Sequence, residues 1–430
     1  MMRNCYAILL IYSIISLGSC SGSTNGHEVH VINVEAAVGT GTIQNASEYI
    51  REFIYIPLET VSGSLIRYTV KDILVENDKI YILNNNLTDL AGYVTIFDMN
   101  GRHISTMNKR GRGPGEFFST YDLDITPSGN MLIMTRSEGT FEYDDDFKFI
   151  KQLRPEKDEG VGILDGWAYD DVVVLKEGLY ALNAANSSRE TLVESRFFVI
   201  YDDSREIQYI EEMQRVMDDG PIRYYGWVYI QYLQDNKLSI YRPETDSIFS
   251  IDFENGYSKS LRYTFNLGKY ALKKSRDEAL DRQEYIDINK NSIHIKNLLE
   301  TDKYIFIEFN FNDLAPEPIK NEAQSMTVAG RTVSHPVWTD GRVHGIYDKK
   351  ENKLTLLNQP IPGTLGLKND LDGGPPVFWP KYITSKKEMV TYYTALEIMD
   401  LIEQGKVDKE LFGDITENDN PIIVIARERH

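Results

Sequence analysis

Short runs of alternating apolar and polar residues recur from about residue 50 to the C-terminus and dominate the sequence as a structural signal. Each run is four to six residues long, and most are bounded by Asn, Asp, Gly or Pro. Alternation between turn-forming residues, with many β-branched and aromatic side chains, is typical of β-strands joined by tight turns. The clearest runs are 53–56, 79–83, 93–97, 131–134, 196–201 and 303–308. The pattern predicts an all-β chain built mainly from antiparallel hairpins.

The turns between these runs also repeat in kind. One type places Asp after an aromatic residue at the end of a run, as in Phe97-Asp98, Tyr143-Asp144, Tyr201-Asp202 and Tyr347-Asp348. Asp98 and Asp144 are 46 residues apart, and four-stranded propeller blades repeat every ~40–50 residues. Later units are longer, so they must contain insertions. The repeat predicts a β-propeller, and no break in composition divides residues 49–430 into two domains.

Two stretches interrupt the strand pattern. Residues 269–287 are rich in charged helix formers, and residues 394–412 carry apolar residues at helical spacing. Both compositions favour helix over strand. We therefore expect small helical insertions in an otherwise all-β fold.

The N-terminus has the features of an export signal. Arg3 precedes an apolar or weakly polar run at 7–17, which is too short for the ~20 apolar residues of a membrane span. Leu17-Gly18-Ser19-Cys20 then resembles the bacterial lipobox. We expect residues 1–19 to be a lipoprotein signal peptide, Cys20 to be lipidated, and residues 20–48 to be a flexible tether. The alternative is an ordinary secretory signal in which Cys20 is incidental.

Charge and residue usage exclude several functions. The net charge of -19 argues against nucleic acid or anionic lipid held by bulk charge. A lipidated Cys20 leaves no cysteine for a disulfide or a nucleophile in the folded body. No HExxH or GxSxG motif is present, and His335 and His344 would lack a third metal ligand. We expect no cofactor and no metal, and the sequence identifies no catalytic residue.

Several strings resemble the six-bladed β-propeller lipoproteins of Bacteroidetes, which are similar in architecture to NHL-repeat and TolB-like propellers. The most specific string is Gly111-Arg112-Gly113-Pro114-Gly115-Glu116-Phe117, and others are Ile56-Pro57-Leu58-Glu59-Thr60, Asn369-Asp370-Leu371-Asp372-Gly373-Gly374-Pro375-Pro376 and Asp419-Asn420-Pro421-Ile422-Ile423-Val424-Ile425. The resemblance implies six four-stranded antiparallel blades and a lipid-anchored envelope protein, with no established activity.

A ring of blades must close on itself, or one blade keeps an exposed edge. Residues 50–58 and 421–427 are the candidates for this closure, so we expect them to lie in the same blade. Residues 21–26 lack the acidic run that surface lipoproteins of this phylum tend to carry. That absence favours the periplasmic side of the bacterial outer membrane.

Two loops contain candidate binding residues. Residues 108–117 include Arg110, Arg112 and Glu116, which either bind an anion at the channel mouth or form a structural loop between blades. The phosphate-binding patterns GxxxxGK[ST] and GxGxxG are both absent from this loop.

Residues 369–380 include Asp370, Asp372 and Trp379, which form either a sugar platform or a buried wedge. A calcium loop is excluded because Lys381 stands where Glu would be needed. Trp167 is a further candidate for ligand binding. Residues 224–229 are rich in aromatic side chains that form either strand core or a stacking face.

The leading hypothesis is a lipid-anchored binding module that presents its central face to a glycan, a peptide or an envelope protein. The alternative is a hydrolase or lyase that acts on a polysaccharide or peptide at the channel mouth, and a third possibility is a scaffold. An enzyme should have convergent carboxylates or a His-lined metal at the axis, with perturbed titration. A binding module should have aromatic and neutral polar groups there, and a scaffold an exposed apolar patch.

Overall fold

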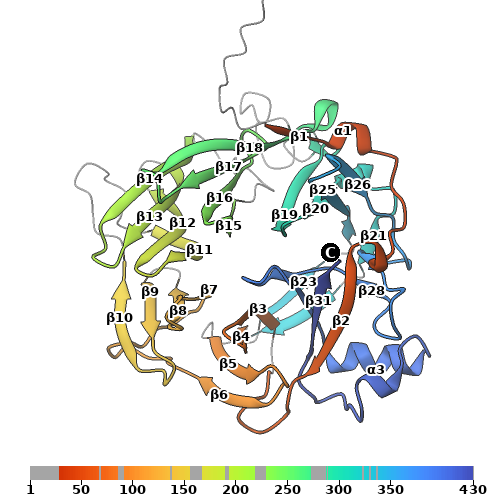
Figure 1. Ribbon diagram of the computed structural model, residues 1–430, viewed down its shortest axis with the longest axis horizontal. Helices are drawn as coiled ribbons and strands as arrows, with labels where there is room; N and C mark the ends of the chain where they lie inside the picture. Colours follow the sequence, from red (N-terminus) through yellow and green to blue (C-terminus); the bar gives the residue numbers. More distant parts are fainter. Residues whose placement is uncertain are drawn as a thin grey trace, which may run out of the picture.

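Six antiparallel sheets stand like blades around a central axis in the computed structural model of the chain (Figure 1). The structure describes residues 29–66, 69–85, 92–135, 138–154, 167–188, 193–217, 229–272, 287, 289–321, 324–328, 331–335 and 338–429. In each blade the first strand lies nearest the axis. The six-bladed, all-β propeller expected from the sequence is confirmed.

The first three blades are formed by consecutive strands. Blade 1 contains β3 (Thr69–Glu76), β4 (Lys79–Asn85), β5 (Gly92–Asp98) and β6 (His103–Met107). Blade 2 contains β7 (Asp122–Ile125), β8 (Met131–Thr135), β9 (Gly139–Tyr143) and β10 (Phe149–Leu153). Blade 3 contains β11 (Trp167–Lys176), β12 (Leu179–Ser188), β13 (Val193–Asp202) and β14 (Ile207–Met217).

The other three blades carry additions. Blade 4 contains β15 (Ile230–Gln234), β16 (Lys237–Arg242), β17 (Ser247–Asp252) and β18 (Ser258–Asn266), with β1 (His30–Asn33) as a fifth strand at its outer edge. Blade 5 contains β19 (His294–Glu300), β20 (Tyr304–Asn310), β25 (Arg342–Asp348) and β26 (Lys353–Leu356). Blade 6 contains β29 (Tyr382–Ile383), β30 (Met389–Tyr393), β31 (Ile422–Glu428) and β2 (Ile50–Pro57).

The ring closes in blade 6, where the N-terminal β2 pairs antiparallel with the C-terminal β31. Ile54 lies opposite Ile425 in this pair, and Ile56 opposite Ile423. Ile56, Ile423 and Ile425 are buried in one apolar cluster with Ile80 and Ile82 of blade 1. The expectation that residues 50–58 and 421–427 share a blade is confirmed.

The recurring Asp turns have a common physical basis. A carboxylate oxygen of Asp144 accepts the backbone N–H groups of Asp146 (3.1 Å) and Lys148 (2.8 Å). Asp98, Asp202, Asp252 and Asp348 make equivalent bonds at the corresponding turns of their blades. An Asp side chain thus satisfies amides that the hairpin leaves free.

Residues 30–48 belong to the folded body, which corrects the expected tether of residues 20–48. Strand β1 pairs in parallel with β18, and Ile32 and Val34 are fully buried. A short helix α1 (Val34–Ala37) follows, Thr42 then bridges Leu357 of blade 5, and η1 (Ala46–Glu48) leads into β2. We call residues 30–48 the N-terminal strap, because they run along the outside of blades 4 and 5 to blade 6 (Figure 1). The apolar alternation that holds it is only a few residues long, which is too brief for a pattern search.

Helices are few, as expected. The stretch 394–412 forms α3 (Ala395–Glu403) and η5 (Lys409–Leu411), which confirms the helical prediction there. Thr394 and Glu397 form a capping box at the start of α3. The stretch 269–287 contributes η2 (Gly268–Tyr270), and most of the rest lies outside the described residues. In the part of the chain that is described, no helix is long and apolar enough to cross a membrane.

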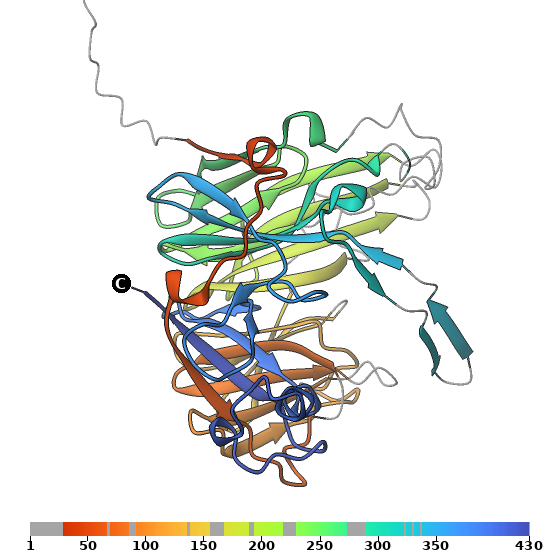
Figure 2. The same ribbon diagram turned by 90° about the vertical axis from the view of Figure 1, so that its right-hand side faces the viewer.

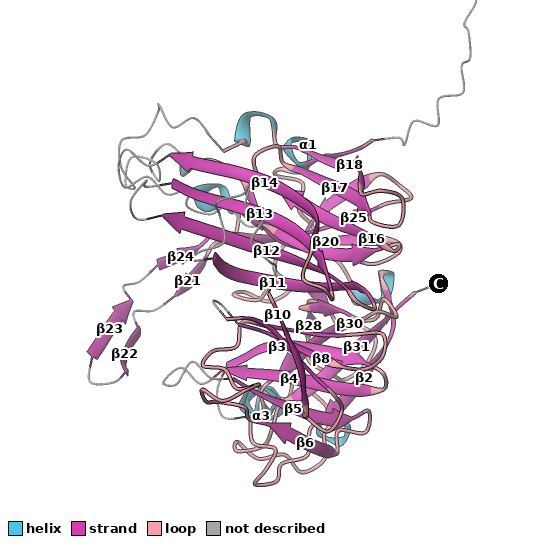
Figure 3. Cartoon of the chain, turned by 90° about the vertical axis from the view of Figure 1, so that its left-hand side faces the viewer, coloured by secondary structure: helices cyan, strands magenta, loops and turns pink. Residues whose placement is uncertain are grey.

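The connection between β20 and β25 contains an insertion. It begins with η4 (Asn312–Leu314), and β21 (Ile319–Asn321) then pairs with β24 (Trp338–Asp340). Beyond them β22 (Gln324–Val328) pairs with β23 (Arg331–His335), and this hairpin projects from the body on the side away from the C-terminus (Figures 2 and 3). Two two-residue strands, β27 (Leu367–Lys368) and β28 (Val377–Phe378), link blades 5 and 6.

Candidate functional site

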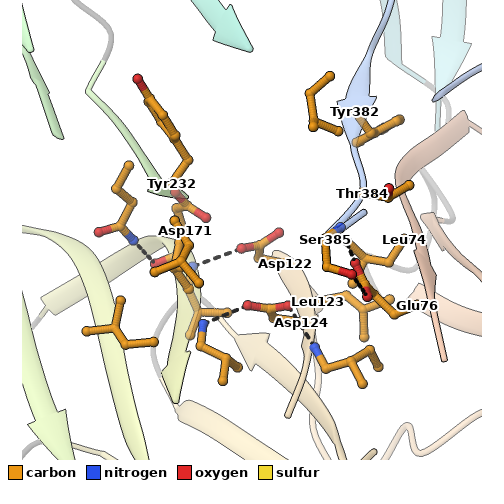
Figure 4. A pocket seen from close by; sticks show the side chains of 18 of the residues that line it. Leu74, Glu76, Asp122, Leu123, Asp124, Asp171, Tyr232, Tyr382, Thr384 and Ser385 are labelled. Atoms are coloured by element: carbon orange, nitrogen blue, oxygen red, sulfur yellow. Dashed lines mark hydrogen bonds between the residues drawn. The ribbon is translucent and has the colours of Figure 1, made fainter. Parts of the chain in front are cut away.

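A cavity of about 740 Å³ lies at the centre of the ring. Its lining comes from the innermost strands of all six blades, β3, β7, β11, β15, β19 and β29, and from the turns that follow them. Figure 4 shows side chains from opposite blades facing one another across this space. The cavity arises because six sheets that meet at an axis cannot all bring their inner edges into contact.

Three aspartates on consecutive blades converge in the cavity wall. Asp72 of β3 and Asp171 of β11 each share a side-chain hydrogen bond with Asp122 of β7. Burial, reinforced by the charge of Asp122, raises the pKa of both Asp72 and Asp171 well above the usual range. Asp72 and Asp171 therefore hold their protons at pH values where an exposed aspartate has lost its proton.

A fourth aspartate, Asp124, extends this group along β7. Its carboxylate accepts the backbone N–H groups of Val174 (2.6 Å) and Ile125 (2.8 Å). Those bonds favour the ionised form, but burial outweighs them and raises the pKa of Asp124 to about 7. Asp122 in turn accepts the N–H of Val172 at 2.8 Å, so blade 2 fastens the free inner edge of blade 3 (Figure 4).

Backbone irregularities place two of these side chains. The ladder register shifts between Val70 and Asp72 in β3, and between Tyr169 and Asp171 in β11. A β-bulge of this kind re-aims the following side chain and increases the local twist. Asp72 and Asp171 therefore occupy equivalent positions in blades 1 and 3, each directly after a bulge.

On the opposite wall of the cavity, a buried glutamate is paired with two cations. Glu300 of β19 is 3% exposed and forms ion pairs with Arg262 and Lys349, both at 2.6 Å. Tyr232 also donates its hydroxyl to Glu300 at 2.6 Å. Burial opposes ionisation of Glu300, but the two cations outweigh it, and the pKa of Glu300 lies below its usual range.

Among the described residues, the four aspartates have no basic partners like those of Glu300. Within the described residues, neither Asp72, Asp122, Asp124 nor Asp171 forms a salt bridge with a basic side chain. The described part of the chain also holds no group of three His, Cys, Asp or Glu side chains arranged to bind a metal ion.

A buried amide completes the acidic wall. Gln231 of β15 is 5% exposed and lines the cavity. Its Nε2 donates to the main-chain oxygen of Asp171 at 3.2 Å, which orients the amide. Its Oε1 has no hydrogen-bond partner among the described residues. A buried acceptor without a donor costs roughly 1–3 kcal/mol, so it is a place where a donor from a ligand or water gains most.

Other polar groups on the wall already have partners. Glu76 accepts both the N–H (2.8 Å) and the hydroxyl (2.5 Å) of Ser385, which ties blade 1 to blade 6. Lys387 donates to Gln234 at 2.7 Å. These contacts fix the turns that surround the cavity.

The loop 108–117 is organised by its own side chains. Glu116 accepts the N–H of Gly113 at 2.8 Å, and a Cβ on Gly111 would lie 1.8 Å from the Glu116 carboxylate. Arg110 forms a backbone bridge with Phe117, and the guanidinium of Arg112 lies over the ring of Phe118 at 5.3 Å. This geometry favours the structural interpretation of the loop. Arg110, Arg112 and Glu116 do not line the cavity.

The loop 369–380 joins blade 6 to the N-terminal region. Asp370 accepts the N–H and hydroxyl of Ser47 at 2.9 and 2.6 Å, which holds the strap. Asp372 accepts the hydroxyl of Tyr55 at 2.9 Å. Trp379 is half-buried and stacks on His344, with ring centroids 3.9 Å apart. These contacts favour the wedge interpretation over the sugar platform, and none of the three acidic or aromatic candidates lines the cavity.

Several other candidates lie outside the described residues. Cys20 and residues 224–228 are among them, as are the side chains of Trp167 and His335. Tyr229 is described and packs against the apolar cluster of Phe198 and Leu238, as the strand-core interpretation predicts. His344 is described, is 4% exposed and faces Glu308 at 3.8 Å.

Sequence reasoning missed the aspartates and Gln231. One signal was available: Asp72, Asp122 and Asp124 are carboxylates within short apolar runs, each just ahead of a recurring turn.

Comparison with solved structures finds the same fold in Bacteroides proteins of low sequence identity. A structure from Bacteroides fragilis NCTC 9343, of a protein inferred to be exported, is 15% identical, covers 94% of this chain and 100% of its own, and has a TM-score of 0.60. A member of the DUF4221 family from Bacteroides vulgatus is 11% identical, with 89% and 98% coverage and a TM-score of 0.48. Among curated proteins, no sequence matches.

The family model described as "Domain of unknown function (DUF4934)" matches residues 29–427, which is almost the whole described body. Its start coincides with the strap rather than with β2, in agreement with the packing of residues 30–48. The chain therefore belongs to this family, the domain of unknown function DUF4934.

Proposed function

We propose that this protein is a cell-envelope propeller that binds a ligand in its central cavity. One observation carries the proposal: all six blades contribute to a cavity of about 740 Å³ whose wall holds carboxyl groups without described counter-ions. Binding sites for small molecules have volumes of about 300–1,000 Å³ and combine apolar walls with a few polar groups. A glycan, a peptide or part of an envelope protein are the ligand classes to test.

Blocking the cavity tests the proposal. Leu74 of β3 lines the cavity and is half-buried, so Leu74→Trp would place an indole in the space. The control is Leu396→Trp on α3, where the side chain is 53% exposed and does not line the cavity. Glycan and peptide libraries screened by direct binding should yield a ligand that the control variant keeps and Leu74→Trp loses. A ligand that both variants bind equally would contradict binding in the cavity.

We further propose that Cys20 carries a lipid anchor after removal of residues 1–19, and that the body faces the periplasm from the outer membrane. The lipobox-like residues 17–20 support this proposal, as does the similar fold of the Bacteroides fragilis protein inferred to be exported. Metabolic labelling with a palmitate analogue should label the wild type and leave Cys20→Ala unlabelled. Protease accessibility of intact cells then separates a periplasmic from a surface location.

A second candidate function is hydrolysis at the cavity, and the aspartates favour it. Convergent carboxyl groups with raised pKa values are what an enzyme at the axis requires. Carboxyl groups in direct hydrogen bonding are closer than the about 5 Å or more that separates glycosidase acid pairs. In this respect they resemble the proton-sharing pair of aspartates that cleaves peptides in aspartic proteases. Turnover of a peptide library that disappears in Asp122→Asn would support this function, whereas binding without turnover would support the binding module.

A further inference from the structure

We propose that the acidic wall of the cavity, formed by Asp72, Asp122, Asp124 and Asp171 with Gln231, binds the ammonium group of an aliphatic amine. The inference rests on the proposed ligand-binding function and specifies the chemistry of that ligand. It also concerns only the described side chains of blades 1 to 4.

The acids on the two sides of the cavity differ in their cationic partners. Glu300, the buried acid of the opposite wall, is paired with Arg262 and Lys349. The same cavity leaves four carboxyl groups on three adjacent inner strands without a cationic partner among the described residues. Without a cation, Asp72, Asp124 and Asp171 hold their protons more tightly than exposed aspartates do, and a nearby cation favours their ionised form. A cation supplied by the ligand would complete this side as arginine and lysine complete the other.

The available acceptors carry the second step. An ammonium group offers three donors and no acceptor. The acidic wall offers carboxyl oxygens and the free Oε1 of Gln231, whose Nε2 is already held by the Asp171 backbone. An amide oxygen cannot neutralise a cation, but it accepts a hydrogen bond from one, so Gln231 adds to ammonium binding without adding charge.

The surrounding wall carries the third step. Leu74, Val173, Leu175 and Leu233 line the cavity around the acidic groups. Figure 4 shows Leu74 and Leu123 interleaved with Asp122, Asp124 and Glu76. Methylene groups next to an ammonium would lie against these aliphatic side chains, whereas a bare metal ion would not use them. The described residues also lack a metal-binding group of three, as noted above.

The test uses cadaverine, with 1,5-pentanediol as an uncharged analogue of the same length. Isothermal titration of the folded protein should show cadaverine binding at least tenfold more tightly than the diol. Asp122→Asn keeps an oxygen for the Val172 amide and removes the charge, so it should weaken cadaverine binding at least tenfold. Asp144→Asn is the control: it makes the same change in the same blade, at an outer turn that does not line the cavity, and should bind as the wild type does.

A second variant protects the test against misfolding. If Asp122→Asn does not fold, as judged by circular dichroism, Asp171→Asn carries the same expectation, since among the described residues no backbone N–H of a neighbouring strand donates to its carboxyl group. Equal affinity for amine and diol, or no binding of cadaverine, would each overturn the inference.

The outcomes also separate this inference from the proposed function. A neutral ligand that Leu74→Trp excludes and Asp122→Asn still binds would overturn the amine and leave the cavity as a binding site. Failure of every library ligand to depend on Leu74 would overturn both.

Discussion

Buried carboxyl groups on the two sides of the cavity are stabilised in opposite ways. Glu300 is ionised between Arg262 and Lys349, while Asp72 and Asp171 have raised pKa values and hold their protons. The first arrangement contributes to stability, and the second lowers it whenever the protons leave. Ligand-binding sites commonly lower the stability of the ligand-free protein in this way.

The pH dependence of stability follows from the raised pKa values. Asp72, Asp124 and Asp171 hold protons in the folded state at pH values where the unfolded chain has released them. Their contribution is therefore complete below a pH of about 4 and is lost as the pH rises, for Asp124 through about 7. Glu76 and Tyr382 are the other titratable groups that face them.

We expect Asp122→Asn to raise the melting temperature of the ligand-free protein at pH 8 by about 1–4 °C, because it removes repulsion from the aspartate group. At pH 5 the gain should be smaller. Thermal unfolding followed by circular dichroism at both pH values measures this. A variant that is less stable than the wild type at pH 8 would show that Asp122 acts mainly through its bond to β11.

Glu300→Gln should destabilise the protein by about 3–5 kcal/mol, because it leaves Arg262 buried without its partner. Since the pKa of Glu300 is depressed, its stabilisation is present above the usual carboxyl range and is lost as the pH falls through the folded-state pKa. Urea unfolding measures the change. Glu254→Gln is the control, because the exposed pair of Glu254 with Lys176 should contribute at most about 1 kcal/mol.

At the scale of elements, the outer hairpin of blades 1 to 5 is held by an Asp at the end of the third strand. We expect Asp144→Ala to cost about 1 kcal/mol, because the N–H groups of Asp146 and Lys148 lose their acceptor. Asp144→Asn should cost much less, because its side-chain oxygen remains. Urea unfolding of the two variants checks the difference, and equal losses would assign the effect to charge instead.

The strands and turns could be predicted from the sequence because their signal is local. The pairs Phe97-Asp98 and Tyr143-Asp144 indicate a turn from a few neighbouring residues. The alternation of residues 79–83 indicates a strand in the same way. The acidic wall could not be predicted in the same way. Asp72, Asp122 and Asp171 are far apart in sequence, and they meet only because bulges and blade packing bring three inner strands together. The strap was missed because only three buried apolar residues, Ile32, Val34 and Ala37, precede the end of α1, and these are too few to form a clear pattern.

At the scale of the whole molecule, closure by β2 and β31 makes the ring one cooperative unit. A chain that begins at residue 38 lacks β1 and α1 but keeps the closure, so it should still unfold in a single transition. A chain that begins at residue 58 lacks β2, which leaves β31 as an unpaired edge, and it should lose cooperative unfolding and aggregate. Scanning calorimetry distinguishes the two, and a single sharp transition in the shorter chain would contradict the role of closure.

The strap also decides how the molecule would respond to a mechanical pull at its first described residues. Force applied at Val29 reaches β1 on blade 4 first, then the Thr42 bridge on blade 5 and the Ser47–Asp370 contact beside blade 6. Only after these have detached does the load reach β2 and the closed ring. The strap therefore detaches contact by contact, which would let the cavity keep its shape while the N-terminal end is under tension.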